Sequence, residues 1–528
     1  MTTALVNSIF FLVISKIYSA ALRGVEAVEV EVEVAAREAD GANAGRINIV
    51  GLPDAAVRES GDRVTTAILA SAMNFVYGVH TVNLAPADLR KEGPSFDLPI
   101  ALAMIACEQE EELPQTRDLM IVGELALDGS LRPVKGALSI ALGAKAAGRK
   151  RLLLPAENAR EAAMVSGLEV YGLKSLHEAW QFITGQDATR PPEPRPKISQ
   201  SNNREHAADL DEVKGQHNVK RALEIAAAGG HNILMVGPPG TGKSMLAKRM
   251  PTIMPDMTEE EAIETTRIHS VAGLLDAREG LVNGRPFRAP HHTISDVGLL
   301  GGGTHPGPGE ISLAHNGVLF LDELPEYRRS TLEVLRQPLE DGKVTISRAA
   351  GTYNFSSKFL LVCALNPCPC GFYGDPVRRC RCNPRQVESY RAKISGPLLD
   401  RIDLHVEVPL IDYKQLSSNE QSESSATVRQ RVMTCRSLQK SRFAKLPQTR
   451  TNSDMGPKTM REHCAVSTEC SMLLEQAMEQ LNFSARAHDR ILKVARTIAD
   501  LTQAEQLAPD HVLEAIQYRS LDRKLSFS

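Results

Sequence analysis

The chain has 528 residues, of which 42% are apolar and 4% aromatic, and its formal net charge at pH 7 is −3. This length predicts three or four domains, and the apolar content is sufficient for ordinary globular cores. The balanced charge argues against a general polyanion-binding coat but does not exclude a local basic channel, and the scarcity of aromatic residues argues against base-stacking platforms.

The beginning of the chain is unusually apolar over residues 4–14, until Lys16 interrupts the run. The run is too short to span a bilayer and lacks the basic leader and cleavage site of a signal peptide. We interpret residues 1–17 as an N-terminal apolar extension, either a tail or the result of a mis-chosen start codon; a packed strand or helix and membrane association are the alternatives. Nine cysteines without a clear secretion signal indicate reduced thiols and a cytoplasmic protein with no membrane partner.

Residues 18–187 are expected to form an α+β domain. Glutamates alternate with apolar residues over 25–34, which predicts a strand with one solvent-facing side. Further strands are predicted at 47–50, 79–84 and 151–154, helices at 54–72, 100–107 and 134–147, a hairpin around Asp128-Gly129, and a helix capped by Ser175.

One segment of this domain, Lys91-Glu-Gly-Pro-Ser95, resembles the nucleophile segment of Lon-type Ser–Lys proteases. Gly123-Glu with Pro133-x-x-Gly136 resembles the region that leads to the lysine of that family. Here the position of the lysine is Ile140, which cannot activate a serine. The resemblance therefore implies a Lon-protease-like domain that is non-proteolytic, with Ser95 as a loop or capping residue.

Residues 188–207 have the composition of a linker, with prolines at 191, 192, 194 and 196 followed by serine and asparagine. The linker separates the first domain from a predicted α/β ATPase core over residues 208–412. A helix is expected over 209–229, and Gly215-Gln216 lies where many ring ATPases place a loop beside adenine.

The strongest motif starts with the apolar run Ile233–Val236, which predicts a buried strand. The next eight residues have the pattern G-x-x-x-x-G-K-S, and residues 245–250 are compatible with a helix. Strand, glycine loop and helix form the context of a phosphate-binding loop (P-loop), whose backbone N–H groups cradle phosphate oxygens. We expect Lys243 to reach the β- and γ-phosphates of ATP and Ser244 to hold Mg²⁺. The predicted nucleotide-binding residues are Gly237, Pro238, Pro239, Gly240, Thr241, Gly242, Lys243 and Ser244.

Two further apolar runs end in polar residues. The run 318–321 precedes Asp322 and Glu323, and the run 359–365 precedes Asn366. Beside a P-loop, Asp322 is expected to bind Mg²⁺ through water, and Glu323 to position and deprotonate the attacking water. Asn366 could orient the same water from a neighbouring strand.

Two arginines are candidates for contact with the γ-phosphate. Arg401 follows a short apolar helix and could stabilise transition-state charge in a neighbouring subunit; an ion pair with Asp400 or Asp403 is the alternative. Arg486 lies in the first turn of a predicted helix, where a basic residue opposes the helix dipole, so we expect it to face an anion; Arg490 is the alternate. Arg401 belongs to the predicted core, whereas Arg486 belongs to an all-α lid predicted over residues 426–525. The helices of this lid are expected at 427–443, 468–480, 485–501 and 509–519.

Two groups of residues raise the question of a transition metal. Cys368, Cys370, Cys380 and Cys382 form two C-x-C pairs that could hold Zn²⁺, with unliganded thiols or a redox pair as alternatives. Nearby basic residues could contact DNA phosphates, or form a solvated face or subunit contact: Arg378, Arg379, Arg381, Arg385, Arg391 and Lys393. The other group is His291, His292 and His305, which we interpret as part of a mobile or interface loop because no partner has ligand spacing.

Together, the P-loop, the adjacent acids, the strand-end asparagine and the helical C-terminal region resemble an AAA+ ATPase. The sequence Leu-Leu-Asp-Arg-Ile-Asp403 and the Gly/His/Pro-rich segment resemble the magnesium-chelatase branch. The whole order, with the stretches 18–24, 48–54, 366–371 and 490–497, is similar to the ComM/YifB family. The fold class implied is multidomain, with a Lon-like α+β domain, an α/β P-loop core and an all-α C-terminal lid.

This resemblance implies an ATP- and Mg²⁺-dependent homohexamer that acts as a motor on branched or single-stranded DNA. ATP would bind at subunit interfaces, with Arg401 and Arg486 acting across them. Family members are associated with branch migration during integration of transforming DNA, so a DNA helicase is expected. The alternative is a magnesium-chelatase-type subunit that drives metal insertion or protein remodelling, and an ATP-dependent peptidase is disfavoured by Ile140.

Overall fold

The computed structural model describes most of the chain: residues 14–37, 45–73, 78–109, 113, 116–187, 189–196, 208–276, 280–303, 306–348, 351–375, 378–410, 422–446, 448–481 and 483–521. The chain forms two compact units. The first consists of Met1–Ile198, Ala262–Val282 and Ser347–Asn354, and the second of Ser199–Glu261, Asn283–Ile346 and Phe355–Ser528. Among the described helices, none combines the length and the apolar character that crossing a membrane requires.

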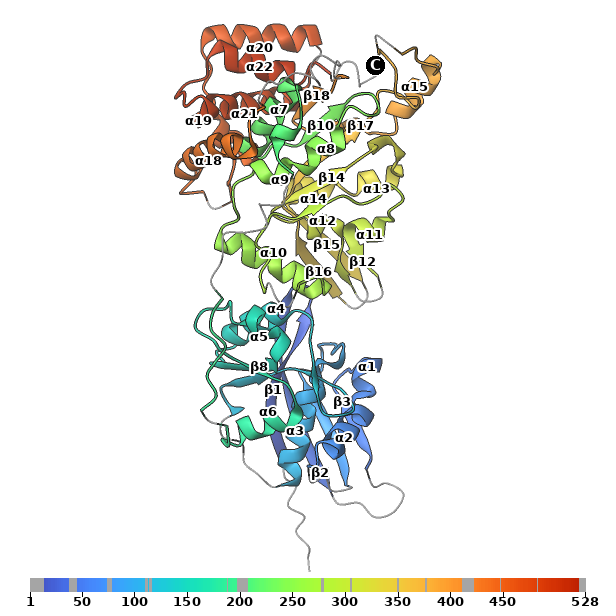
Figure 1. Cartoon of the computed structure of the whole chain (residues 1–528), viewed down its shortest axis with the longest axis vertical. Helices are drawn as coiled ribbons and strands as arrows, with labels where there is room; N and C mark the ends of the chain where they lie inside the picture. The colour runs from blue at the N-terminus through green and yellow to red at the C-terminus, as the bar shows by residue number, and fades with distance from the viewer. Residues whose placement is uncertain are drawn as a thin grey trace, which may run out of the picture. The chain divides into compact units, whose positions relative to one another are not determined.

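The first unit, which contains the blue end of the chain in Figure 1, is built on a seven-stranded sheet with the order β3-β4-β2-β1-β5-β8-β9. β2 pairs antiparallel with β1 and β4, and the other neighbours in the sheet are parallel. The strands are β1 (Ile14–Arg23), β2 (Glu26–Arg37), β3 (Ile47–Val50), β4 (Val79–Ala85), β5 (Leu119–Ile121), β8 (Arg151–Pro155) and β9 (Glu169–Leu173), with a small hairpin of β6 (Glu124–Leu125) and β7 (Leu131–Arg132).

The alternation in β2 is confirmed by its burial. Its valines at 30, 32 and 34 are fully buried in the core, whereas the intervening glutamates lie on the opposite face. That face carries ion pairs, because Lys16 contacts Glu31 and Glu33. β1 starts at Ile14, where it pairs with Ala35, so the sheet reaches four residues into the segment interpreted as an extension. Residues 1–13 lie outside the described residues.

Helices cover this sheet, and α3 and α4 pack against β1 and β2. The helices of the first unit are α1 (Ala55–Arg58), α2 (Ser60–Ala70), α3 (Asp97–Glu108), α4 (Ala137–Ala146), α5 (Ala156–Ala162) and α6 (Leu176–Ile183). Ser175 caps α6 as expected, because its side chain accepts a hydrogen bond from the Glu178 N–H. Ser95 lies in a short 3-10 helix, η2 (Pro94–Phe96), and Ile140 is buried in α4.

The second unit contains a five-stranded parallel sheet with the order β11-β14-β17-β10-β18. Its strands are β10 (Ile233–Val236), β11 (Phe287–Arg288), β14 (Val318–Leu321), β17 (Leu360–Leu365) and β18 (Leu404–Glu407). The apolar runs expected to be buried strands are therefore confirmed in β10, β14 and β17. Because the sheet is parallel, the carboxyl ends of these three strands meet at one edge, which is where α/β proteins place their ligands.

Short helices surround this sheet and connect its strands. They are η5 (Leu210–Glu212), α7 (His217–Gly229), α8 (Lys243–Lys248), α9 (Met250–Ile253), α11 (Asp296–Leu300), α12 (Glu310–Leu313), η6 (Leu324–Glu326), α13 (Arg329–Glu333), α14 (Arg336–Asp341), α15 (Pro384–Arg391) and α16 (Gly396–Leu399). Two small hairpins are formed by β12 (Gly301–Gly302) with β13 (Gly307–Pro308) and by β15 (Lys343–Arg348) with β16 (Gly351–Ser356). Helix α10 (Glu259–Ala272) begins in the second unit and continues into the first.

The C-terminal region is helical, as predicted. It consists of α18 (Ser425–Arg442), η7 (Asn452–Asp454), α19 (Pro457–His463), α20 (Thr468–Leu481), α21 (Ala485–Leu501) and α22 (Pro509–Gln517). Four of these helices match the predicted ranges closely, whereas α19 was not predicted. Ser484 caps α21 through the Ala487 N–H, and α18 and α21 pack against α7.

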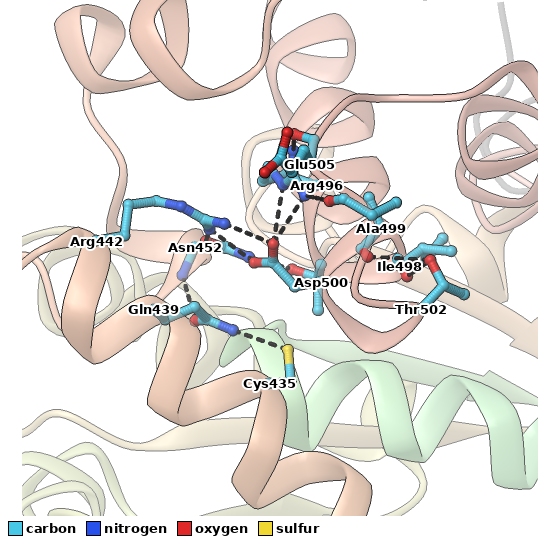
Figure 2. A network of polar contacts seen from close by, with 12 residues as sticks. Cys435, Gln439, Arg442, Asn452, Arg496, Ile498, Ala499, Asp500, Thr502 and Glu505 are labelled. Carbon is cyan, nitrogen blue, oxygen red and sulfur yellow. Dashed lines mark hydrogen bonds and ion pairs between the residues drawn. The ribbon is translucent and has the colours of Figure 1, made fainter.

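A buried charge network joins α18 to α21 (Figure 2). The Asp500 carboxylate accepts hydrogen bonds from both Arg442 terminal nitrogens at 2.6 and 2.7 Å, from Arg496 Nε at 3.0 Å and from Asn452 Nδ2 at 2.8 Å. Gln439 extends the network by accepting from the Asn452 N–H. Four hydrogen bonds, three of them from guanidinium groups, therefore compensate the Asp500 carboxylate although it is buried.

Candidate functional site

The P-loop joins β10 to α8, in the strand–loop–helix context that the motif requires. Gly240 and Gly242 have φ angles of +82° and +85°, in the left-handed region that favours glycine. A side chain built at either position would meet nothing within 4 Å, so the backbone conformation rather than lack of space requires glycine. The resulting loop presents open backbone beside the start of α8, as a phosphate cradle must.

Lys243 lies along the inside of this loop. Its ammonium donates hydrogen bonds to the carbonyl oxygens of Gly237 at 2.7 Å and Pro238 at 2.8 Å, and to Asn366 Oδ1 at 3.2 Å. Burial lowers the pKa of this amine, while the carboxylates of Asp322 and Glu323 act in the opposite direction. The structure thus brings together the lysine and the strand-end asparagine that the sequence singled out.

Ser244 meets the acid at the end of β14. Its Oγ donates to Asp322 Oδ2 at 2.5 Å, and that short contact places a hydroxyl and a carboxylate oxygen side by side. Mg²⁺ prefers oxygen ligands and is usually held by one or two protein groups together with substrate phosphates. The two residues therefore fit a magnesium ion beside the P-loop.

Glu323 follows Asp322 in a left-handed conformation, with φ of 51°. Its own N–H donates to Asp322 Oδ1 at 2.9 Å, and its side chain is half-exposed. His292 Nδ1 lies 3.6 Å from Glu323 Oε2, a neighbour that was not predicted. The conformation turns the glutamate away from the strand direction, and the histidine lies where it can influence the orientation of the carboxylate.

The segment that carries His292 is fixed near β14 by Tyr327, whose hydroxyl donates to the Pro290 carbonyl at 2.6 Å. Burial raises the pKa of Tyr327, so its hydroxyl remains a donor.

His291 packs against His292, with ring centroids 4.1 Å apart. His305 lies outside the described residues. Within the described ranges, the four cysteines are the one group of at least three His, Cys, Asp or Glu residues close enough to hold a metal. The interpretation of His291 and His292 as part of a mobile or interface loop stays a prediction.

Gln216 is also close to the P-loop. It is buried in a left-handed conformation, and its Nε2 donates to the Thr241 carbonyl at 2.7 Å. Its Oε1 is buried without a hydrogen-bond partner in the described structure. An acceptor left open beside the P-loop is available to a ligand donor.

Arg401 forms an ion pair that the sequence did not indicate. Its guanidinium pairs with Glu340 and donates to the Pro397 carbonyl at 2.5 Å, and the residue is 7% exposed. Among the described contacts, Arg401 pairs with neither Asp400 nor Asp403. The local ion pair that the sequence offered as an alternative is therefore replaced by one between residues 61 positions apart. In a single copy of the chain, the arginine is thus engaged by its own core.

The two lid arginines have different surroundings. Arg486 is exposed in the first turn of α21. Arg490, the alternate, pairs with Asp403, which also lies 3.0 Å from His231 Nδ1. Burial would raise the pKa of Asp403, but Arg490 and His231 outweigh it and hold that pKa well below its ordinary value. Arg490 therefore ties the lid to the start of β10 and β18, and of these two arginines only Arg486 lies exposed at the surface.

The four cysteines converge after β17 and before α15. The Sγ atoms of Cys368, Cys370 and Cys380 lie 3.4–3.7 Å apart, and those of all four lie within 4.8 Å of one another. Backbone N–H groups of Arg381 and Phe372 lower the pKa of Cys370 to about 6. Most of the neighbouring basic residues are exposed, but Arg391 Nε donates to the Pro367 carbonyl at 3.1 Å and so takes part in the fold.

Known proteins resemble the chain along most of its length. Models of the family described as "Magnesium chelatase, subunit ChlI" match residues 209–416, "Subunit ChlI of Mg-chelatase" residues 30–158, and "Magnesium chelatase, subunit ChlI C-terminal" residues 422–519. A local match to the DNA replication licensing factor mcm7 of Schizosaccharomyces pombe is 26% identical over 207 residues, 37% of this chain and 23% of that protein.

Two relatives match over almost their full length. The uncharacterized protein YifB of Escherichia coli is 42% identical over 513 residues, covering 97% of this chain and 98% of YifB. The competence protein ComM of Haemophilus influenzae is 43% identical over 513 residues, covering 96% of this chain and 98% of ComM. The chain therefore belongs to the ComM/YifB family of magnesium-chelatase-like AAA+ proteins.

Proposed function

We propose that this protein hydrolyses ATP to ADP and phosphate with Mg²⁺ as cofactor. The observation that carries the proposal is the convergence of Lys243, Ser244, Asp322 and Asn366 at one edge of the parallel sheet. Lys243 and Ser244 begin α8, Asp322 follows β14 and Asn366 follows β17, and together they supply the parts that phosphoryl transfer requires. Membership in an AAA+ family supports the same reaction.

Each residue has a distinct role in this proposal. The residues Gly237 to Ser244 bind the phosphates, and Gln216 offers an acceptor to the base. Mg²⁺, held by Ser244 and Asp322, would offset the charge of the phosphate oxygens. Glu323 takes the proton of the attacking water, and Asn366 orients that water from β17.

We place ATP at the interfaces of a homohexamer, with Arg401 and Arg486 reaching the nucleotide of the neighbouring subunit. Support comes from their positions, because Arg401 follows a short helix at the sheet and Arg486 is exposed in the lid. Arg401 must leave Glu340 to act in this way. Such an exchange would link assembly of the ring to hydrolysis, since an arginine supplied from a neighbour stabilises transition-state charge.

The motor would act on DNA, as a branch-migration helicase in the integration of transforming DNA. The relative named competence protein ComM supports this assignment, and the local match to a DNA replication factor adds weaker support. The exposed arginines around the four cysteines are candidates for phosphate contacts. In this proposal the N-terminal domain is Lon-like and non-proteolytic, and the protein works in the cytoplasm.

The alternative is an ATPase that drives metal insertion or protein remodelling, which the three magnesium-chelatase family models favour. ATP hydrolysis measured without DNA, with single-stranded DNA and with a four-way junction separates the two. Strong stimulation by DNA, with ATP-dependent assembly seen by light scattering, is the expected result. Hydrolysis that is indifferent to DNA would contradict the DNA motor and favour the alternative.

A further inference from the structure

We propose that Cys368, Cys370, Cys380 and Cys382 bind one Zn²⁺ in a closed structural site that braces the P-loop. The four side chains come from two separate segments, one after β17 and one before α15. They are the group within the described residues whose ligand atoms all lie close enough for a metal. Nothing in the proposed ATPase reaction uses them, so their convergence calls for another explanation.

Three of the six sulfur–sulfur distances are close to those of a tetrahedral thiolate site, and all six are within 4.8 Å. Zinc–sulfur bonds of about 2.3 Å in a tetrahedron place neighbouring sulfurs about 3.8 Å apart. The three Sγ pairs here are separated by 3.4, 3.7 and 3.6 Å. A disulfide requires about 2.05 Å, so none of these pairs is bonded in the structure. A redox pair would need two cysteines, whereas four have been brought together.

Backbone N–H groups donate hydrogen bonds to sulfurs of this cluster. The N–H of Cys382 donates to Cys380 Sγ at 3.4 Å, and the N–H groups of Phe372 and Arg381 donate to Cys370. Hydrogen bonds of this kind orient metal ligands and compensate their charge. When Zn²⁺ binds, each cysteine that is still protonated releases its proton to solvent, so that all four ligands are thiolates and no electron is transferred.

The location of the cluster indicates what the metal would hold. Cys368 is fully buried two residues after Asn366, which contacts Lys243. Gly371, between the cysteine pairs, has φ of +85°, and a Cβ added there would come within 2.5 Å of Pro239 in the P-loop. The loop that the metal closes therefore rests directly on the phosphate-binding loop.

The other end of the cluster leads into α15. Asn383 follows Cys382 at once and forms a reciprocal capping box with Gln386. Arg391, in the last turn of α15, returns to the Pro367 carbonyl beside Cys368. Zinc would thus fasten α15, the end of β17 and the P-loop into one rigid corner. Four protein ligands leave no open position, so the ion is structural and not catalytic.

Metal analysis of the full chain, purified without metal-affinity resin, tests the site. We expect about one zinc per chain, and loss of most of it in C380S. The matched control is C470S, because Cys470 is a buried cysteine in the lid that lies outside the cluster. Full zinc retention in C380S, or a metal-free wild type with four reactive thiols, would overturn the proposal.

A second measurement does not depend on the variants folding. An organomercurial titrated into the wild-type protein should release zinc as the cluster thiols react, and Co²⁺ in place of zinc should give the charge-transfer absorption of a tetrahedral thiolate complex. Release of zinc before the cluster cysteines are modified, located by mass spectrometry, would place the metal elsewhere and overturn the assignment.

The bracing role rests on the proposed ATPase, and its test can fail independently of the metal site. Zinc removal should lower ATP turnover roughly tenfold or more, since a small misplacement of reacting groups has effects of that size, and zinc added back should restore it. Unchanged turnover in zinc-free protein would contradict the bracing role while the metal content still stood. An inactive zinc-loaded protein would instead contradict the proposed ATPase.

Discussion

At the scale of single residues, Glu323 stands out because it occupies a left-handed conformation directly after the magnesium candidate Asp322. If it is the general base, E323Q should retain ATP binding and lose at least about 100-fold in hydrolysis, the range expected for a removed base. Nucleotide binding can be followed with a fluorescent ATP analogue, and turnover by phosphate release. E326Q is the matched control, since Glu326 lies three residues later in η6 and contacts only Lys393 among the ion pairs described. Retained turnover in E323Q would remove Glu323 from the mechanism.

Asp403 gives a prediction about acid stability at the same scale. Its folded-state pKa is lowered, so the carboxylate contributes stability above its unfolded pKa of about 4, and this contribution is lost as the pH falls below that value. The D403N variant should therefore show a smaller loss of stability than the wild type between pH 5 and pH 3, measured by the urea midpoint for the second unit. D400N, at a neighbouring aspartate, should follow the wild type. Equal slopes in wild type and D403N would show that the Arg490 and His231 contacts do not stabilise the folded state.

Single residues also show how far a sequence can predict a site. Lys243, Ser244, Asp322 and Asn366 could be named because each lies at a fixed distance from a buried strand, and parallel strands end at a common edge. The ion pair of Arg401 with Glu340 could not be named, because it joins residues 61 positions apart on α14 and near α16. The approach of His292 to Glu323 depends likewise on a loop whose course no local pattern determines.

At the scale of elements, the joint between α18 and α21 depends on the buried Asp500 network (Figure 2). D500N would leave Arg442 and Arg496 buried with less compensation, and breaking a buried ion pair from one side costs about 3–5 kcal/mol. We expect the opening free energy of α21 amide hydrogens, measured by hydrogen exchange, to fall by that order. D489N is the control on the same helix, because the Asp489 side chain is 54% exposed. Equal protection in D500N and D489N would show that apolar packing alone holds the joint.

Elements were predictable where local pattern and burial agree. β10, β14 and β17 are short, wholly apolar and bounded by turn residues, which is the pattern of a strand buried on both faces. β18 was missed because its four residues include a histidine and a glutamate, and its place depends on Asn232, whose carbonyl accepts from the Asp403 and Leu404 N–H groups. β1 was missed because the apolar run before it obscured its alternation. The short α19 has too few turns to show a period.

At the scale of the whole molecule, an active site shared between two subunits predicts that two inactive variants can complement each other in a mixed ring. A site contained in one chain does not allow this. If Glu323 acts in one subunit and Arg401 in its neighbour, E323Q and R401A should each be inactive alone. A mixed ring restores intact sites wherever an R401A subunit supplies its glutamate and an adjacent E323Q subunit supplies its arginine. With equal co-expression and random order, about one quarter of the sites are intact, so turnover should recover to about a quarter of wild type if sites act independently.

A further variant separates the contact of Arg401 with Glu340 in its own subunit from the proposed contact with the nucleotide of the neighbouring subunit. R401A also removes the pair with Glu340, so E340Q serves as the control: it releases Arg401 without removing it and should retain turnover. Assembly of the mixed rings is checked by light scattering and by two different affinity tags purified in succession, so that failure to mix is not mistaken for failure to complement. Assembled mixed rings without recovered turnover would contradict a shared site and confine both residues to roles within one chain. Recovery would instead mean that a lone subunit is incomplete, because the arginine that its own core holds beside Glu340 serves the nucleotide of the next copy.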